Sequence, residues 1–225
     1  MPAPRARPVA KAARVRLGLP AAPSSLAPSP KSLKALNRLI LEAPPLVKGG
    51  GRAVLGEGPI GADIAFVGEQ PGDQEDRTGK PFVGPAGKLL DRAMAEAGID
   101  RKRSYVTNAV KHFKFEQRGK RRIHSKPTAG EVKHYRWWLE KELDLVKPRL
   151  VVALGATAAL ALAGKPISVR AHRGAYSFAG RPGYVTVHPS FLLRMRDEDK
   201  VEAWRQFVSD MKKIRKQAEK EGGLK

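Results

Sequence analysis

The sequence predicts an α/β protein: a three-layer α/β/α sandwich around a central, mostly parallel sheet of four strands. Four short, almost continuously apolar runs alternate along the chain with helical segments. This alternation is typical of a parallel sheet that helices cover on both faces. Hydrophobic residues make up 41% of the 225 residues, which is enough for one sizeable core.

The first half of the chain supplies two of the strands. A helix over residues 32–41 places its apolar side chains on one side and ends before a Pro-Pro pair, which stops a helix. An apolar run over residues 64–67 ends in a glycine and predicts a buried strand. A helix over residues 86–97 turns two leucines and a methionine inward, and residues 105–110 form the next strand. A long basic loop, residues 111–127, follows.

The second half repeats the alternation. A helix over residues 131–146 carries a tryptophan and two leucines on its inner side. Residues 150–154 predict a strand, and residues 156–163 predict the helix behind it. The last strand, residues 184–187, precedes a closing helix over residues 200–214, whose large apolar side chains form one stripe.

The two ends of the chain differ from this domain, which we place at residues 31–218. Residues 1–30 are rich in Ala and Pro, with five basic residues and no acidic one. Such a segment cannot bury enough apolar surface to order itself, so we expect a disordered basic arm. It could bind DNA or be a tolerated tail; its seven prolines argue against the amphipathic helix of a mitochondrial transit peptide. Residues 219–225 are expected to be a flexible basic tail.

The charge balance indicates a polyanionic partner. Lys and Arg number 43 against 22 Asp and Glu, which gives a formal charge of +21. Nucleic acid is the favoured partner, ahead of an acidic membrane surface or a solvated basic surface with no partner. No apolar run is long enough for a transmembrane helix. The absence of cysteine excludes disulfides, thiolate nucleophiles, Cys-ligated zinc and ordinary iron–sulfur clusters.

Parallel sheets bind ligands at the carboxyl ends of their strands, where this sequence has chemically useful side chains. Glu69 follows the first strand, Asn108 lies near the end of the second, and His188 follows the last. Glu69 could orient a nucleophile, act as a base or stabilise a cation, or it could simply bind backbone N–H groups. Asn108 offers a donor and an acceptor to a flat base, or it caps a turn. His188 could donate to an oxygen that gains negative charge, or it is a structural histidine.

Two further segments suit a nucleic-acid site. Phe82 lies outside the apolar stripe of its helix and could stack on a base, although a core position is the commoner role. Residues 119–126 contain four cations suited to a phosphate backbone. Among these cations stands His124, whose neutral form is favoured by like-charge repulsion and can act as a nucleophile. On the charge pattern alone, a phosphate contact is the favoured role of His124.

Taken together, these segments resemble the uracil-DNA glycosylase superfamily, and within it the UdgX branch most closely. The resemblance runs from about residue 56 to 211 and is carried by GEQPGDQED (68–76), GKPFVGPAGKLLDRA (79–93), YVTNAVKHFKF (105–115), KRRIHSKP (120–127), LGATAA (154–159) and HPS (188–190). It implies catalytic roles for Glu69, His124 and His188. It implies that Gln70, Phe82 and Asn108 bind uracil. Further residues of the loop and the DNA-binding surface would be Lys120, Arg121, Arg122, Ser125, Lys126, Ser190 and Arg194.

The resemblance also implies an unusual chemistry. In UdgX-type proteins the histidine that matches His124 bonds covalently to the deoxyribose carbon exposed by excision, and the DNA is not released. The residue that matches Arg122 helps to position this histidine. The expected partner is uracil-containing DNA, single-stranded for preference, and we expect a monomer with no membrane contact in the bacterial cytoplasm at the nucleoid. An ordinary turnover glycosylase and a non-catalytic nucleic-acid binding module remain the alternatives.

One departure from the family concerns its cofactor. Members of this branch bind a four-iron cluster, chiefly through cysteines, whereas this chain has none. The expected ligand positions fall near Leu41, Pro44 and Tyr135, and His112 keeps the place of a histidine ligand. We therefore expect no cluster and no other metal. Packing by Leu41, Tyr135 and their neighbours would have to hold that flank instead.

Overall fold

The computed structural model describes residues 29–222. The predicted basic arm therefore lies outside the described residues, apart from Ser29 and Pro30. No helix within the described range is long and apolar enough to cross a membrane.

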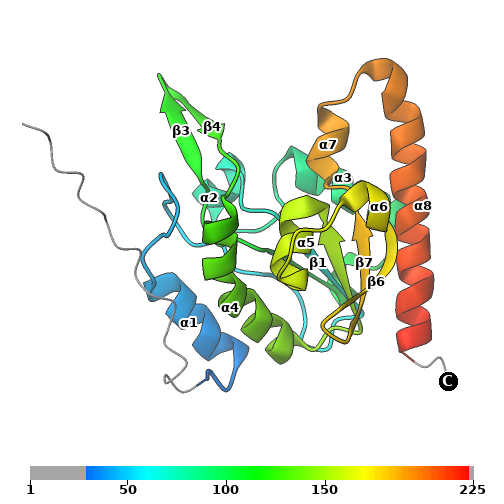
Figure 1. The fold of residues 1–225 in the computed structure, drawn as a ribbon, viewed down its shortest axis with the longest axis horizontal. Coiled ribbons are helices and arrows are strands. Elements are labelled where there is room, and N and C mark those ends of the chain that lie inside the picture. Colours follow the sequence, from blue (N-terminus) through cyan, green and yellow to red (C-terminus); the bar gives the residue numbers. More distant parts are fainter. Residues whose placement is uncertain (1–28, 223–225) are drawn as a thin grey trace, which may run out of the picture.

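A twisted sheet of five strands forms the middle layer, in the order β2-β1-β5-β7-β6 (Figure 1). Four neighbours run parallel, namely β1 (Ile64–Gly68), β2 (Ser104–Asn108), β5 (Leu150–Leu154) and β7 (Arg181–Thr186). The mostly parallel sheet is thus confirmed, but the predicted number of four strands is wrong. The missed edge strand, β6 (Gly174–Phe178), pairs antiparallel with β7, and its exposed positions hide it from a search for apolar runs.

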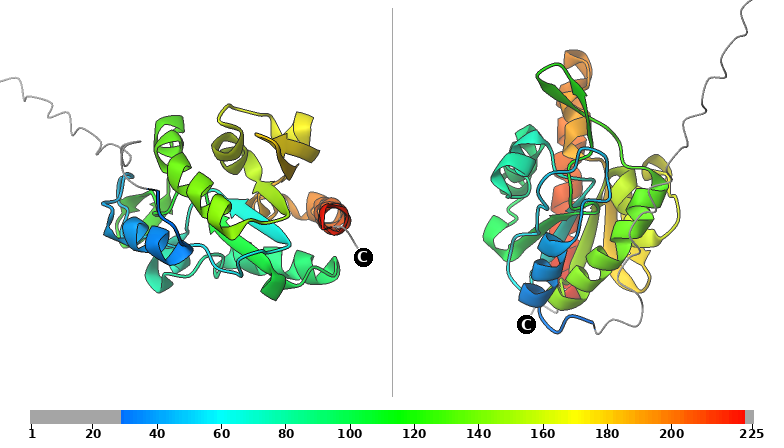
Figure 2. Two further views of the ribbon diagram at one scale, coloured as in Figure 1. Left: turned by 90° about the horizontal axis from the view of Figure 1, so that it is seen from below. Right: turned by 90° about the vertical axis from the view of Figure 1, so that its left-hand side faces the viewer.

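Successive side chains of the central strands enter two separate cores, because side chains alternate between the faces of a sheet. Val67, Val151 and Val185 pack on one face against α1 (Leu33–Glu42), α4 (Ala129–Val146) and α5 (Gly155–Ala163). Phe66, Val152 and Tyr184 pack on the other face against α3 (Pro85–Glu96) and α8 (Asp197–Glu221). Figure 2 shows the resulting three layers. These layers are the predicted α/β/α sandwich.

The helix ends follow local chemistry. The hydroxyl of Thr128 accepts from the backbone of Glu131, and the Glu131 side chain reaches back to Thr128, which makes a capping box at the start of α4. Short segments connect the larger elements: α2 (Asp73–Thr78), the 3₁₀ turn η1 (Arg101–Arg103), α6 (Val169–His172) and α7 (Pro189–Leu193).

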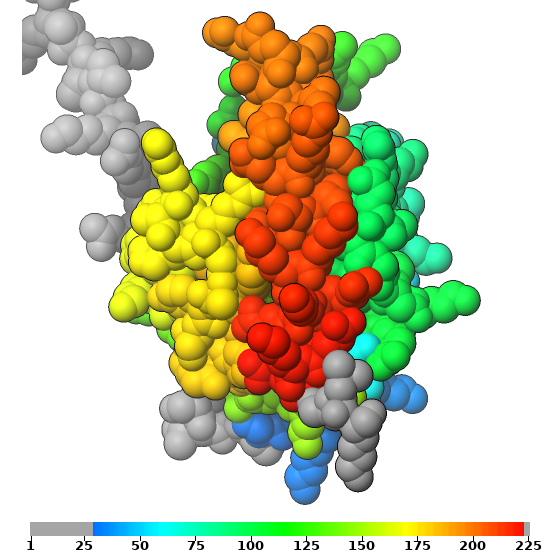
Figure 3. Space-filling model, turned by 90° about the vertical axis from the view of Figure 1, so that its right-hand side faces the viewer, coloured from blue at the N-terminus to red at the C-terminus, as the bar shows by residue number. Residues whose placement is uncertain are grey.

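The closing helix is longer than predicted. α8 covers one edge of the molecule between α3 and the β6–β7 region (Figure 3). It continues to Glu221, so the predicted flexible tail is helical from residue 219 to residue 221. The tail from residue 223 onward lies outside the described residues.

The predicted long basic loop contains a β-hairpin, which corrects the expectation. Strands β3 (Phe115–Arg118) and β4 (Arg121–His124) pair antiparallel, so that Phe115 faces His124 across the ladder. Gly119 makes the turn with φ 57°, a conformation that glycine adopts without strain. The hairpin projects beyond the carboxyl ends of the parallel strands (Figure 1). It therefore carries His124 to the edge of the sheet where ligands bind in such folds.

Candidate active site

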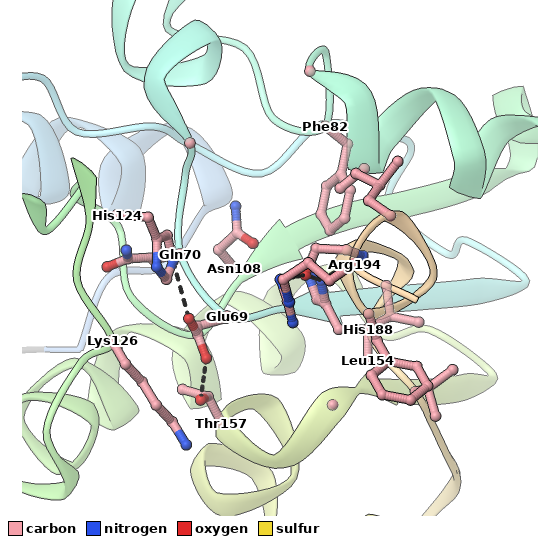
Figure 4. Close-up of a pocket in the computed structure, with 18 of the residues that line it drawn as sticks. Glu69, Gln70, Phe82, Asn108, His124, Lys126, Leu154, Thr157, His188 and Arg194 are labelled. Carbon is pink, nitrogen blue, oxygen red and sulfur yellow. Dashed lines mark hydrogen bonds and ion pairs between the residues drawn. The ribbon is translucent and has the colours of Figure 1, made fainter. Parts of the chain in front are cut away.

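A cavity of about 1270 Å³ opens at the carboxyl ends of the parallel strands. It collects side chains from the ends of the strands, the hairpin, and the starts of α3, α5 and α7. The predicted site residues that line it are Glu69, Gln70, Phe82, Asn108, His124, Lys126, His188, Ser190 and Arg194. The labelled side chains in Figure 4 surround one hollow. The other predicted residues, Lys120, Arg121, Arg122 and Ser125, are not among its lining.

Glu69 joins two parts of the site. Its Oε1 lies 3.1 Å from Nε2 of His124, and its Oε2 accepts a hydrogen bond of 2.5 Å from the Thr157 hydroxyl (Figure 4). Burial raises the pKa of the Glu69 carboxyl, but the hydrogen bonds from His124 and Thr157 outweigh burial, so the pKa lies below its usual value. Glu69 is therefore an oriented anion. Sequence reasoning missed Thr157, although LGATAA places it on the first turn of α5, directly after a strand.

His124 is the last residue of β4, and its side chain is 51% exposed toward the cavity. The preceding Arg122 fixes the hairpin against α2. Its guanidinium binds the carboxylates of Asp73 and Asp76 at 2.5 Å each and stacks over the Phe115 ring at 5.1 Å. These contacts occupy Arg122 and argue against the predicted phosphate contact. The expected role of Arg122 in positioning His124 stays a prediction.

Gln70 holds the base of the same hairpin. Its Nε2 donates to the carbonyl oxygens of Lys114 and Ser125, and its Oε1 accepts from the Lys114 N–H. The amide group is thus bound to the backbone just before β3 and just after β4. Both N–H groups of the amide are used, whereas Oε1 accepts one hydrogen bond and can accept a second, so the expected contact of Gln70 with uracil stays a prediction.

Phe82 and Asn108 meet above the end of β1. An added Cβ at Gly68 would lie 2.4 Å from Oδ1 of Asn108 and 2.7 Å from Cζ of Phe82, so both groups close in on this glycine. Phe82 has φ 56°, which is unusual for an aromatic residue and costs conformational energy. Both side chains are buried yet line the cavity. The arrangement offers a flat apolar surface and an amide to one planar ligand.

His188 is held in one tautomer. Its Nδ1 accepts from the backbone N–H of Ser190 and lies 2.8 Å from the Ser190 hydroxyl, which in turn accepts from Arg194. Because a backbone N–H can only donate, the ring proton of neutral His188 is on Nε2. Burial is the main cause that lowers the pKa of His188 to about 4. His188 is therefore a neutral donor near neutral pH.

The cations divide into two groups. Lys126 and Arg194 line the cavity, together with Arg170 of α6, which sequence reasoning missed. Lys120 and Arg121 are exposed at the far end of the hairpin. The hydroxyl of Ser190 lies 2.8 Å from Nδ1 of His188 and accepts from Arg194, so it helps to orient His188, and its expected contact with DNA stays a prediction.

The residues at the predicted cluster positions do not fit an iron–sulfur cluster. Tyr135 is buried, and its hydroxyl lies 2.7 Å from Nδ1 of His112 and accepts from the Leu46 N–H at 3.1 Å. Burial lowers the pKa of His112 to about 4, so the imidazole that shares this hydrogen bond with the tyrosine is neutral. Leu41 is 57% exposed, which corrects the expectation that it packs into this flank. Thiolates hold such clusters, and this chain has no cysteine.

Comparison with known proteins identifies the family to which this chain belongs. Residues 55–212 match the family model described as the uracil DNA glycosylase superfamily. A type-4 uracil-DNA glycosylase of Thermotoga maritima is 38% identical over 172 residues, which are 75% of this chain and 84% of the relative. A second type-4 enzyme, from Pyrobaculum aerophilum, is 33% identical over 159 residues, or 67% of this chain and 78% of the relative.

These relatives carry the type-4 name, so the resemblance to the UdgX branch stays a prediction. The family match spans the sheet, the hairpin and every predicted residue that lines the cavity. With its α/β/α layers and with Glu69, Asn108 and His188 at one edge of the sheet, this chain belongs to the uracil-DNA glycosylase superfamily.

Proposed function

We propose that this protein excises uracil from DNA and that His124 then captures the exposed sugar carbon covalently. One observation carries the proposal: the His124 imidazole lies 3.1 Å from the Glu69 carboxylate, in the wall of a cavity that Phe82, Asn108 and His188 also line. An imidazole beside an oriented carboxylate is the arrangement of an activated nucleophile.

Base recognition falls to Phe82 and Asn108. The flipped uracil stacks on the Phe82 ring, which the cavity leaves accessible. Asn108 supplies an acceptor for the N3–H group of the base and a donor for a carbonyl oxygen. Single-stranded DNA is preferred because no base pair has to be opened.

Bond cleavage produces opposite charges that the site stabilises. The bond between C1′ and N1 of uracil breaks, and its electron pair leaves with the base as an anion. The Nε2–H of neutral His188 donates to this anion. The sugar becomes cation-like, and the Glu69 carboxylate stabilises it.

Capture completes the reaction without water. A lone pair of the His124 ring forms the bond to C1′, and the alkylated ring then carries the positive charge. The Glu69 carboxylate stabilises this cation. Both oxygens of Glu69 already accept from protein groups, Oε1 from His124 and Oε2 from Thr157, which favours histidine over water as the nucleophile.

DNA is collected by the basic surface around the cavity. Lys126, Arg170 and Arg194 stand at the cavity, and the exposed hairpin end adds Lys120 and Arg121. Cations placed in this way bind phosphates with little dependence on sequence. We expect a monomer to suffice, because one chain supplies all of these groups.

The second candidate is an ordinary turnover glycosylase, in which water takes the place of His124. The names of the type-4 relatives favour it. Both candidates share the same base pocket and the same bond cleavage. They differ in the fate of the sugar, which a denaturing gel can show.

The deciding experiment incubates the protein with a single-stranded oligonucleotide that contains one uracil. We expect a heat- and detergent-resistant adduct with the wild type, none with His124→Ala, and a normal adduct with the control variant His134→Ala on α4. Released uracil with repeated turnover and no adduct would establish the turnover enzyme instead. Salt-sensitive binding that ignores uracil, without excision, would show a non-catalytic binding module.

A further inference from the structure

A buried ion pair lies directly behind the base pocket. Lys111 and Glu142 have fully buried side chains, and Nζ of Lys111 lies 2.5 Å from Oε2 of Glu142. The ammonium group also donates to the Thr107 hydroxyl at 2.7 Å and to the carbonyl oxygen of Asn108 at 3.0 Å. All three donors of the ammonium group are therefore used.

Glu142 is equally well satisfied. Its carboxylate accepts from the Tyr105 hydroxyl at 2.9 Å and from the Thr107 hydroxyl at 3.0 Å, in addition to Lys111. Four side chains thus form one closed polar network inside an otherwise apolar core. Such a network rigidifies its surroundings when every member is bound.

The stability of the fold does not by itself explain why a charged pair lies in this core. Removing two charges from water is costly, and an apolar pair of similar volume often stabilises a core as well or better. The network also reaches one specific place, the last residue of β2. There the next two residues are tied to β1, because Ala109 N–H donates to Gly68 and Val110 N–H donates to Glu69, both at 3.0 Å. Lys111 binds the carbonyl group that precedes this junction.

We infer that the Lys111–Glu142 pair positions Asn108 for the edge of a pyrimidine and thereby contributes to the choice of uracil. The inference rests on the proposed role of Asn108. The amide points toward Gly68 and Phe82, so a small shift of its backbone would move it relative to a base stacked on Phe82. A polar group that has to match a donor and an acceptor at once tolerates little displacement.

The test removes both charges together. Lys111→Met with Glu142→Gln leaves an amide oxygen for Tyr105 and Thr107 but no donor for the Asn108 carbonyl group. Single-turnover excision is measured against the concentration of uracil-containing single-stranded DNA, with thermal unfolding of each variant alongside. We expect a half-saturating concentration about tenfold higher and a maximal rate within about twofold of the wild type, the pattern of lost binding.

A double-mutant cycle separates positioning from a general loss of structure. If the pair acts through Asn108, the charge-free variant adds no further loss in an Asn108→Ala background. Losses that add would overturn the inference, as would wild-type saturation by a well-folded charge-free variant. If that variant does not fold, Thr107→Val, which breaks the network at its hydroxyl, takes its place in the same cycle.

The same experiment tests the proposed function separately, through the activity of Asn108→Ala. If Asn108→Ala excises uracil as the wild type does, the role of Asn108 in base recognition is wrong. If Asn108→Ala is impaired while both network variants are not, only the positioning inference is wrong.

Discussion

Among single residues, Glu69 organises the chemistry, because each of its oxygens faces a different partner. His124 binds one oxygen and Thr157 the other. The hydroxyl of Thr157 carries no charge and forms no bond to the substrate in this account, so its role is to fix the direction of the carboxylate. The low pKa of Glu69 keeps the carboxylate ionised throughout the neutral range.

Replacing Glu69 by glutamine tests whether uracil excision needs the negative charge of this side chain or only its size. Glu69→Gln keeps the size of the side chain but removes the charge that stabilises the cation-like sugar, and we expect single-turnover uracil excision to slow by at least about 100-fold. Thr157→Val removes one hydrogen bond, and we expect a loss of about tenfold. Measured rates on a uracil-containing oligonucleotide check both values. Equal rates for Glu69→Gln and wild type would show that the carboxylate takes no part in cleavage.

The sequence was informative about these residues to different degrees. Glu69, Asn108 and His188 could be placed together because the carboxyl ends of parallel strands share one edge. The partners of Gln70 and Ser190 could not be foreseen, since they depend on which side-chain atoms meet after folding. Thr157 was missed because only the geometry of the strand-to-helix junction turns it toward Glu69.

Among the secondary-structure elements, the β3–β4 hairpin decides whether capture is possible. It is tied down at its base by Gln70 and Arg122, and Lys114 adds an ion pair of 2.8 Å to Glu131 of α4. The sequence indicated a basic loop here because its residues are polar at nearly every position. The tight turn at Gly119 and the cross-strand pairs convert the loop into a rigid arm.

Loosening the hairpin is expected to impair capture more than cleavage. Arg122→Ala breaks the contacts with Asp73 and Asp76 and frees the strand that carries His124. We predict an adduct yield reduced by about tenfold or more, with excision of uracil less affected, since positioning contributes most to bond formation. Arg118→Ala, an exposed hairpin position, is the matched control. Equal losses of adduct and excision in Arg122→Ala would contradict this role of the hairpin.

In the molecule as a whole, the flank where the resemblance placed cluster ligands is held by hydrogen bonds between side chains and backbone. The hydrogen bond between Tyr135 and His112 joins α4 to the segment after β2, and the Leu46 N–H adds the segment after α1. We predict that purified protein contains no stoichiometric iron and keeps its activity in the presence of a chelator. Elemental analysis and an absorption spectrum check this, and iron that is required for excision would contradict it.

Two buried histidines, His112 in this flank and His188 in the cavity, predict how the stability of the protein depends on acid. His112 and His188 both have a pKa of about 4, below the ordinary value of about 6.5. Between these values the unfolded chain binds protons that the folded protein does not, so the free energy of unfolding falls as the pH is lowered from about 6.5 toward 4. His112→Gln, which keeps an acceptor for Tyr135, is expected to make this dependence shallower. Urea unfolding at several pH values measures this dependence. If the free energy of unfolding of His112→Gln changes with pH as steeply as that of the wild type, groups other than His112 cause the effect.

The overall architecture was more predictable than its edges. Buried strands are recognised as short apolar runs and amphipathic helices by their apolar stripes. The three layers then follow from the alternation of strands and helices along the chain. The edge strand β6 alternates half-buried and exposed positions, and the hairpin strands are exposed at most positions, so a search for apolar runs detects neither. The expectation for Leu41 was also wrong, because this leucine lies on the outer side of α1.

The identity of the nucleophile is tested by mapping the adduct. After reaction with uracil-containing single-stranded DNA, nuclease digestion and trypsin should leave the modified side chain on the peptide of residues 123–133, since the Lys126–Pro127 bond resists trypsin. Mass spectrometry is expected to place a deoxyribose-derived group on His124. A modification on any other residue, or an unmodified peptide after complete excision, would contradict covalent capture by His124.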